Sequence, residues 1–213
     1  GSCETGAHVE VFEGATLLCS APCSAGQFSC EAGPRSDGAH DLFARQTDAA
    51  GNASASSSNR AFTVDTRIDP ATFTQPSADA LLATLTPTIA GACESDATVT
   101  VTSGATTACT ASCIASTFSC ISTPLTEGAH TLQVSQVDRA GNISAPTQRT
   151  VRLDATLPGA PTLTAPTAGA FLPATTLTIE GGCETGALVE VFAGPTSLCS
   201  AMCADDKFTC TSP

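Results

Sequence analysis

Apolar and polar residues alternate along short segments of this chain, and turn residues separate the segments. Apolar and polar residues alternate over most of residues 132–137 (LQVSQV) and at every position of 62–65 (FTVD), the period of a strand with one buried face. Residues 189–192 and 196–199 form a similar pair around the turn at 193–195 (AGP). No stretch repeats its apolar residues every 3.6 positions, so the pattern predicts an all-β chain without helices.

The cysteines repeat with a period of 90 residues. They lie at positions 3, 19, 23 and 30, again at 93, 109, 113 and 120, and again at 183, 199, 203 and 210. Other segments keep the same offset, such as residues 48–52 (DAAGN) and 138–142 (DRAGN). Three sets with one spacing indicate tandem repeats, and a period of 90 residues is long enough for each repeat to be a closed domain.

About seven short strands per repeat, each bounded by Gly, Pro, Asn or Asp, are typical of an Ig-like β-sandwich. A fibronectin-type topology would produce the same pattern. We therefore expect tandem Ig-like (fibronectin III-like) β-sandwiches with a 90-residue repeat.

Three motifs strengthen this expectation. Gly-Ala-His-x-Leu begins at residue 38, Gln-x-Asp-x-Ala-Gly-Asn-x-Ser spans 46–54 and 136–144, and Phe-Thr-Val-Asp-Thr spans 62–66. Together they resemble the bacterial Ig-like repeats of large surface adhesins, here in a cysteine-rich variant, over the whole chain. Phe28, Phe118 and Phe208 stand where that family usually has a tryptophan.

The resemblance implies that each domain begins after the Val-Asp-Thr element. Residues 1–65 would then be a repeat lacking its first strands, residues 66–155 a complete repeat, and residues 156–213 a repeat lacking its last strands. The missing strands could come from a neighbouring copy or from the same chain. Because the 213 residues exceed two periods by 33, joining head to tail would duplicate a segment. We therefore expect a window of a longer continuous array.

Twelve cysteines in one chain favour an oxidising, extracellular compartment and two disulfides per repeat. A four-cysteine zinc site is the rival interpretation, but the spacing contains only one short Cys-x3-Cys pair.

If residues 8–12, 17–22 and 27–31 form a meander, Cys23 lies near Cys3 and Cys19 lies near Cys30. The equivalent pairs are Cys93–Cys113, Cys109–Cys120, Cys183–Cys203 and Cys199–Cys210. The alternative joins Cys3 to Cys30 and Cys19 to Cys23, with Pro22 bending the short loop.

Charge and composition narrow the function. The net charge of −12 disfavours binding to nucleic acid, and no run of about 18 apolar residues could span a membrane. No Ser/His/Asp arrangement recurs with the repeat, and the chain contains neither Cys-x-x-Cys nor a glycine-rich phosphate loop. We expect no enzymatic activity and no required cofactor.

Asp48 and Asp138 open the turns at 48–52 and 138–142. The simplest interpretation is a β-turn in which Asp caps its own backbone and the Gly and Asn adopt positive φ. The sharper interpretation is calcium at the domain junctions, with Asp65 or Asp154 as further oxygen ligands. The resemblance supports this interpretation, because calcium often stiffens the linkers of related adhesins.

The sequence thus predicts a structural segment of an extracellular fibre, stalk or filament at a bacterial cell surface. Its partner would be the protein itself, through head-to-tail or lateral assembly. The alternative is an adhesin binding module that recognises a glycan or a host or cell-surface protein. The loops at 31–37 and 121–127 differ in sequence, which leaves both hypotheses open.

Overall fold

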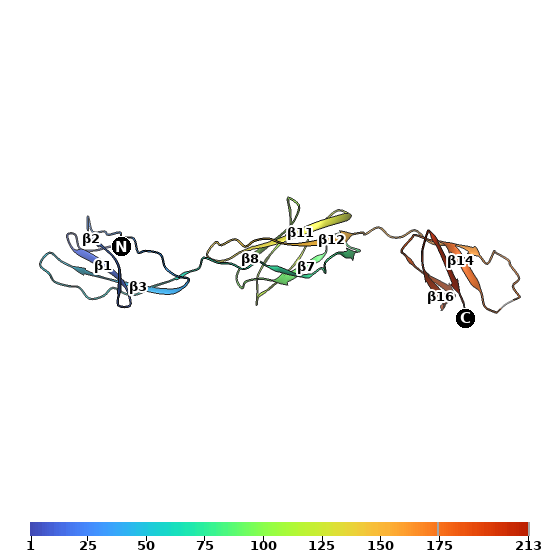
Figure 1. Cartoon of the computed structure of the whole chain (residues 1–213), viewed down its shortest axis with the longest axis horizontal. Helices are drawn as coiled ribbons and strands as arrows, with labels where there is room; N and C mark the ends of the chain where they lie inside the picture. The colour runs from blue at the N-terminus through green and yellow to red at the C-terminus, as the bar shows by residue number, and fades with distance from the viewer. Residues whose placement is uncertain (174, 213) are drawn as a thin grey trace. The chain divides into compact units, whose positions relative to one another are not determined.

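The computed structural model describes residues 1–173 and 175–212 of the chain. Its regular secondary structure consists of β-strands, as the alternating pattern predicts (Figure 1). The chain divides into two compact units, Gly1–Asp154 and Ala155–Pro213. Within the described residues, no helix has the length and apolarity needed to cross a bilayer.

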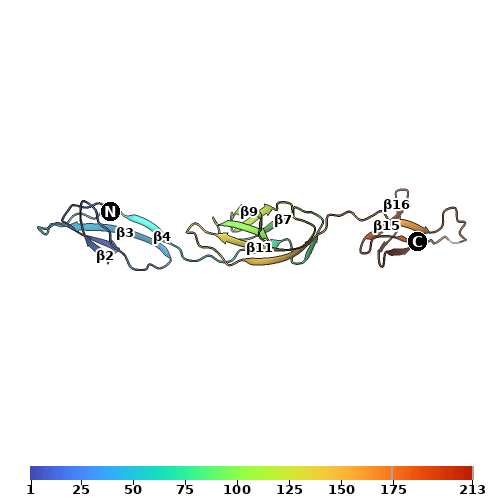
Figure 2. The same cartoon turned by 90° about the horizontal axis from the view of Figure 1, so that it is seen from above.

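The second repeat is a sandwich of two β-sheets, seen from two directions in Figures 1 and 2. One sheet has the strand order β10-β7-β5, and the other has the order β6-β12-β11-β8-β9. All pairings are antiparallel except that between β6 and β12. The strands are β5 (Thr72–Gln75), β6 (Ala80–Leu82), β7 (Thr88–Ala92), β8 (Thr98–Ser103), β9 (Thr106–Ser112), β10 (Thr117–Ile121), β11 (Gly128–Val137) and β12 (Thr147–Leu153).

The core of this repeat lies between its two sheets. Ile89 and Phe118 from the smaller sheet belong to one buried cluster with Val99 and Leu132 from the larger sheet. Along β11, buried side chains alternate with more exposed ones from Leu132 onward, which is the period of two that the sequence shows. The predicted Ig-like sandwich class is therefore confirmed for this repeat.

The first repeat contains the four strands that correspond to β8, β9, β11 and β12. They form one sheet of order β2-β1-β3-β4. Their bounds are β1 (His8–Glu13), β2 (Thr16–Pro22), β3 (Gly38–Thr47) and β4 (Arg60–Val64).

Residues 27–31 of the first repeat do not form the third strand of a meander, contrary to the expectation from the sequence. The equivalent residues form β10 in the second repeat and β17 in the third, where they pair with β7 and β14 respectively. Among the described residues, no strand of the β7 type lies beside residues 27–31. A strand needs a hydrogen-bonded partner, and at this position the partner comes from a distant part of the repeat.

The third repeat forms two small sheets, of order β13-β14-β17 and β15-β16. Their strands are β13 (Thr162–Ala165), β14 (Thr178–Gly182), β15 (Leu188–Ala193), β16 (Thr196–Met202) and β17 (Lys207–Thr211). Ile179, Val189 and Phe208 form its buried cluster together with Cys210.

Each repeat holds two disulfides whose loops overlap along the chain. In the second repeat, Cys109 of β9 is bonded to Cys120 of β10, so the disulfide joins edge strands of the two sheets. Cys93 and Cys113, bonded to each other, follow β7 and β9. The corresponding pairs are Cys3–Cys23 and Cys19–Cys30 in the first repeat, and Cys183–Cys203 and Cys199–Cys210 in the third. These pairs are those favoured by the strand order rather than the alternative set.

A glycine lets strand β5 and an aromatic ring approach the middle of β7. Gly91 pairs with Phe118 across the β7–β10 ladder. A Cβ atom at Gly91 would lie 1.7 Å from the carbonyl oxygen of Thr72 and 2.5 Å from the Phe118 ring. Gly181 in the third repeat is in the same situation against Thr162 and Phe208. The glycine is therefore required for the smaller sheet to close with the aromatic ring over it.

We expect Gly91→Ala to lower the free energy of unfolding of the second repeat by about 3 kcal/mol or more, because a backbone oxygen must move to admit the methyl group. Urea denaturation followed through the amide NMR signals of β7 and β10 measures this change. Gly33→Ala is the control, since nothing lies within 4 Å of a Cβ at that position. Equal stability of the two variants would contradict this account of the sheet.

Candidate metal site at the linker

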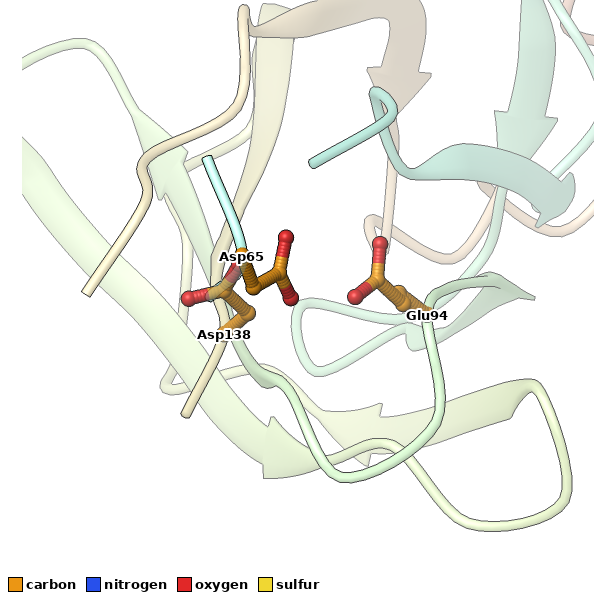
Figure 3. A group of neighbouring side chains, drawn as sticks. All are labelled: Asp65, Glu94 and Asp138. Carbon is orange, nitrogen blue, oxygen red and sulfur yellow. The ribbon is translucent and has the colours of Figure 1, made fainter. Parts of the chain in front are cut away.

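Three carboxylates come together where the segment after β4 meets the second repeat (Figure 3). Asp65 directly follows β4, Glu94 lies in the loop between β7 and β8, and Asp138 directly follows β11. One carboxylate oxygen of each residue lies within 4.8 Å of the others. Figure 3 shows the Asp65 and Asp138 carboxylates side by side, with that of Glu94 facing them.

This arrangement is chemically suited to a hard cation. Calcium takes six to eight oxygen ligands at about 2.3–2.6 Å, and carboxylates are its usual protein ligands. Three carboxylates at this separation repel one another, and a divalent cation between them would remove the repulsion. Glu94 and Asp65 are exposed and Asp138 is half-buried, so solvent can reach the cluster.

The Asp138 carboxylate also holds the turn that carries it. Its Oδ1 accepts a hydrogen bond from the Asn142 backbone N–H at 2.9 Å, and its Oδ2 accepts one from Asn142 Nδ2 at 2.7 Å. In the first repeat, Asp48 accepts the same two bonds from Asn52, both at 2.8 Å. Both aspartates therefore stabilise their own turns, whether or not a cation binds.

The turn conformation differs in one respect from the sequence expectation. Gly51 and Gly141 have φ of 90° and 92°, whereas Asn52 and Asn142 do not have positive φ. The expectation of positive φ for the asparagines was wrong. Their side chains instead donate to the aspartate that opens the turn, and the glycine alone supplies the left-handed residue.

These hydrogen bonds keep both turn aspartates ionised. The Asn52 side chain, followed by its backbone N–H, holds the pKa of Asp48 below its ordinary value. At Asp138, partial burial opposes ionisation, but the donors of Asn142 outweigh it and the pKa is again lowered. A carboxylate that is already charged is the form a cation requires.

The structure brings together two of the four aspartates expected to bind calcium. Asp65 and Asp138 share the cluster, whereas Asp48 and Asp154 lie outside it. Asp154 follows β12, whose last residue Leu153 pairs with the first residue of β11, so Asp154 and Asp138 lie at opposite ends of that strand. The expectation of calcium stays a prediction, now with Glu94 as the third carboxylate.

Sequence reasoning did not select Glu94. Its only indication was the recurrence of Cys-Glu at positions 3, 93 and 183. The loop that carries it is held at its start by the Cys93–Cys113 disulfide.

A second polar cluster lies in the first repeat, around His40. Its Nδ1 is 2.6 Å from the Glu13 carboxylate, and its Nε2 is 2.8 Å from the Ser36 carbonyl oxygen. Both neighbours accept hydrogen bonds, so both ring nitrogens must carry protons and the charged imidazolium is favoured. The Ser36 carbonyl and then Glu13 raise the pKa of His40, with Arg35 as the neighbouring charge that opposes them. His40, through its hydrogen bond, lowers the pKa of Glu13 in turn.

The second repeat places a serine where the first has Glu13. His130 Nδ1 is 2.9 Å from the Ser103 hydroxyl, while its Nε2 faces the Thr126 carbonyl. A hydroxyl can either donate to the ring or accept from it, so this site does not require both ring nitrogens to carry protons. The equivalent histidines His40 and His130 thus have different hydrogen-bond partners at Nδ1, a carboxylate in the first repeat and a hydroxyl in the second.

Comparison with known proteins follows the architecture. Residues 72–155 match the family model described as "Bacterial Ig-like domain". The second repeat is a bacterial Ig-like domain. This match confirms the family resemblance that the sequence motifs indicated. The copy of the Gln-x-Asp-x-Ala-Gly-Asn-x-Ser motif at 136–144 lies inside the matched residues. No curated protein matches the chain.

Among solved structures, the fibronectin(III)-like modules of CbhA from Clostridium thermocellum are 20% identical, with a TM-score of 0.45 over 72% of this chain and 80% of theirs. The BSP domain of a biofilm-associated protein is also 20% identical, with a TM-score of 0.32 over 71% of this chain and 25% of that one. A Bacteroides ovatus protein, SGBP-B, in complex with a mixed-linkage heptasaccharide is 14% identical, with a TM-score of 0.29 over 94% of this chain and 58% of that one.

We expect calcium to bind at the Asp65–Glu94–Asp138 cluster with a dissociation constant of roughly 10⁻⁴ to 10⁻³ M, the range of extracellular modules. At about 10 mM calcium, the second repeat would gain about 1–3 kcal/mol of stability. Calorimetric titration and thermal unfolding of chelator-treated protein measure both quantities. Glu94→Gln should abolish most of the gain, whereas Glu4→Gln, at the same position of the first repeat, should not. Absence of binding at 10 mM would refute the site.

The His40–Glu13 pair predicts a pH dependence of the first repeat. The raised pKa of His40 gives a stabilisation that is complete below its ordinary value of 6.5 and lost as the pH rises through the folded value. The lowered pKa of Glu13 gives one that is complete above 4.5 and lost as the pH falls through the folded value. Both contributions are present together between these two ordinary values.

Glu13→Ser, which introduces the residue of the second repeat, should lower the pKa of His40. NMR titration of the His40 ring protons measures it, with Glu10→Ser as a control on the same strand. If the His40 pKa stays the same without Glu13, the hydrogen bond between them does not control its titration.

Proposed function

We propose that this chain is a structural segment of an extracellular tandem Ig-like fibre, stalk or filament of a bacterial surface. The observation that carries the proposal is that all three repeats have the same pair of overlapping disulfides at the same positions. A feature repeated in every domain serves the array as a whole, whereas a single binding or catalytic function needs only one copy.

The composition of the core supports this proposal. The buried residues of the second repeat include one Phe from β10 and one from β5, and otherwise mostly Ala, Val, Leu and Ile. The two disulfides of the second repeat join cysteines that are 20 and 11 residues apart. In the chain-entropy model, a disulfide that closes a loop of about 15 residues contributes about 3 kcal/mol. That amount is a large part of the net stability of a small domain, which is about 5–15 kcal/mol. Covalent closure would keep such domains folded outside the cell, against proteases and tension.

The partner in this proposal is the protein itself, by head-to-tail or lateral assembly, and no catalytic step is involved. The family match of the second repeat supports a secreted or surface location, since the domain is bacterial, Ig-like and rich in disulfides.

The second candidate function is an adhesin module that binds a glycan or a surface protein. The observation in its favour is that the corresponding loops at 31–37 and 121–127 differ in sequence between the first two repeats.

Electron microscopy of cells that produce the protein, without reducing agent and with gold-labelled antibodies against the chain, tests the structural proposal. We expect the label along thin fibres or stalks that have a regular axial repeat. Label confined to one tip of a surface structure, with specific binding of the purified chain on a glycan array, would favour the binding module. Label found only on dispersed soluble protein would contradict both.

A further inference from the structure

The linker between the first and second repeats, residues 65–70, lies against the end of the second repeat that carries the acidic cluster. Three successive contacts hold it there. Asn142 Nδ2 donates to the backbone carbonyl of Asp65 at 3.1 Å, and Gln136 Nε2 donates to that of Asp69 at 2.6 Å. Between them, Ile68 packs against the hydrophobic core of the repeat.

Gln136 connects the linker to the loop after β7. It is 1% exposed, although it is polar. Its Oε1 accepts a hydrogen bond from the backbone N–H of Glu94, and its own backbone N–H donates to the Ser144 hydroxyl. The amide nitrogen is left to point at the Asp69 carbonyl. Without the linker, a buried donor would lose its partner, which is costly in a protein interior.

The polar residues of the motif Gln-x-Asp-x-Ala-Gly-Asn-x-Ser therefore act together in the second repeat. Asp138 and Asn142 hold the turn, and Ser144 holds the backbone of Gln136. The side-chain amides of Gln136 and Asn142 then face the linker, with their hydrogens directed at carbonyl oxygens four residues apart.

We propose that this end of the second repeat is a docking site for the extended linker, with Gln136 and Asn142 as an amide clamp that fixes the linker without a metal ion. The clamp recognises two backbone carbonyls and one apolar side chain. Binding of the linker therefore depends on its extended backbone and on the position of Ile68, and not on the charge of its side chains. Pro70 follows at once and restricts φ, which shortens the stretch of chain left free to bend.

The inference does not depend on the structural function proposed above, because a binding module could also have a clamped linker. It also differs from the calcium prediction, since the contacts that hold the linker go to the backbone carbonyls of Asp65 and Asp69 and need no cation, although Asn142 Nδ2 also donates to the Asp138 carboxylate.

The rate of trypsin cleavage after Arg67 measures how often the linker detaches from the second repeat. The Arg67 side chain is 90% exposed, so trypsin can reach it, but cleavage needs the surrounding backbone to detach and extend. In the presence of a chelator, we expect Gln136→Met and Asn142→Ala each to speed cleavage after Arg67 by about tenfold. Met keeps the length of the side chain and removes the donor. Cleavage after Arg35, in the loop of the first repeat, is the reference within each digest.

Gln46→Met is the matched control. Gln46 has the same position in the first repeat and accepts from the backbone N–H of Glu4 in the same way. The linker contacts Gln136 and not Gln46. This variant should leave cleavage after Arg67 unchanged, so the loss of an amide at this position of the motif is separated from release of the linker.

Unfolding of the whole repeat is distinguished by Arg149 and Arg152, which lie in β12. Faster cleavage at these two sites together with Arg67 would report unfolding rather than release. The heteronuclear NOE of the backbone amides of residues 66–69 in the unaltered chain then decides. Values as high as those of β11 support the clamp. Values typical of a free loop, or cleavage after Arg67 as fast as after Arg35 in the unaltered chain, overturn it.

Discussion

The overlapping disulfides are the constraint on which each repeat depends. Cys109–Cys120 ties β9 of one sheet to β10 of the other, and Cys93–Cys113 closes the adjoining end of the sandwich. Backbone hydrogen bonds hold strands within a sheet, whereas the two sheets are held together mainly by side-chain packing, with a few hydrogen bonds such as that from Arg149 of β12 to the Phe73 carbonyl of β5. With a core made largely of small aliphatic residues, the covalent link supplies part of the cohesion that larger side chains would otherwise provide.

Close approach of the backbone is the other consequence of small residues. Gly91 lets β5 and the Phe118 ring come within contact distance of β7, so the ring packs directly against a position of β7 that has no side chain. Phe208 and Gly181 repeat this arrangement. The glycine and the phenylalanine therefore act as one packing unit, and the disulfide at Cys120, two residues after Phe118, holds the ring-bearing strand in place.

The acidic cluster and the amide clamp occupy the same end of the second repeat. The turn that opens with Asp138 contributes to both, since its carboxylate faces Asp65 and Glu94 while Asn142 holds the Asp65 carbonyl. A segment that connects two repeats is thus bound through its backbone as well as through its side chains. The physical result is a linker whose conformation is set by the domain that follows it.

Some of this was determined by the sequence alone. The 90-residue cysteine period and the strand alternation around Leu132 and Val134 depend on neighbours along the chain, so local pattern was enough to predict them. The disulfide pairs of the structure are those favoured from the sequence, but the meander behind that expectation is not formed, because β10 and β17 pair with β7 and β14. Tertiary structure decided the rest. Glu94 joins Asp65 and Asp138, Gln136 meets Asp69, and β10 pairs with β7 rather than with β9, because each of these outcomes depends on segments that are far apart in sequence. Alternation and spacing show which face of a strand is buried, but they do not show which distant residue lies opposite it.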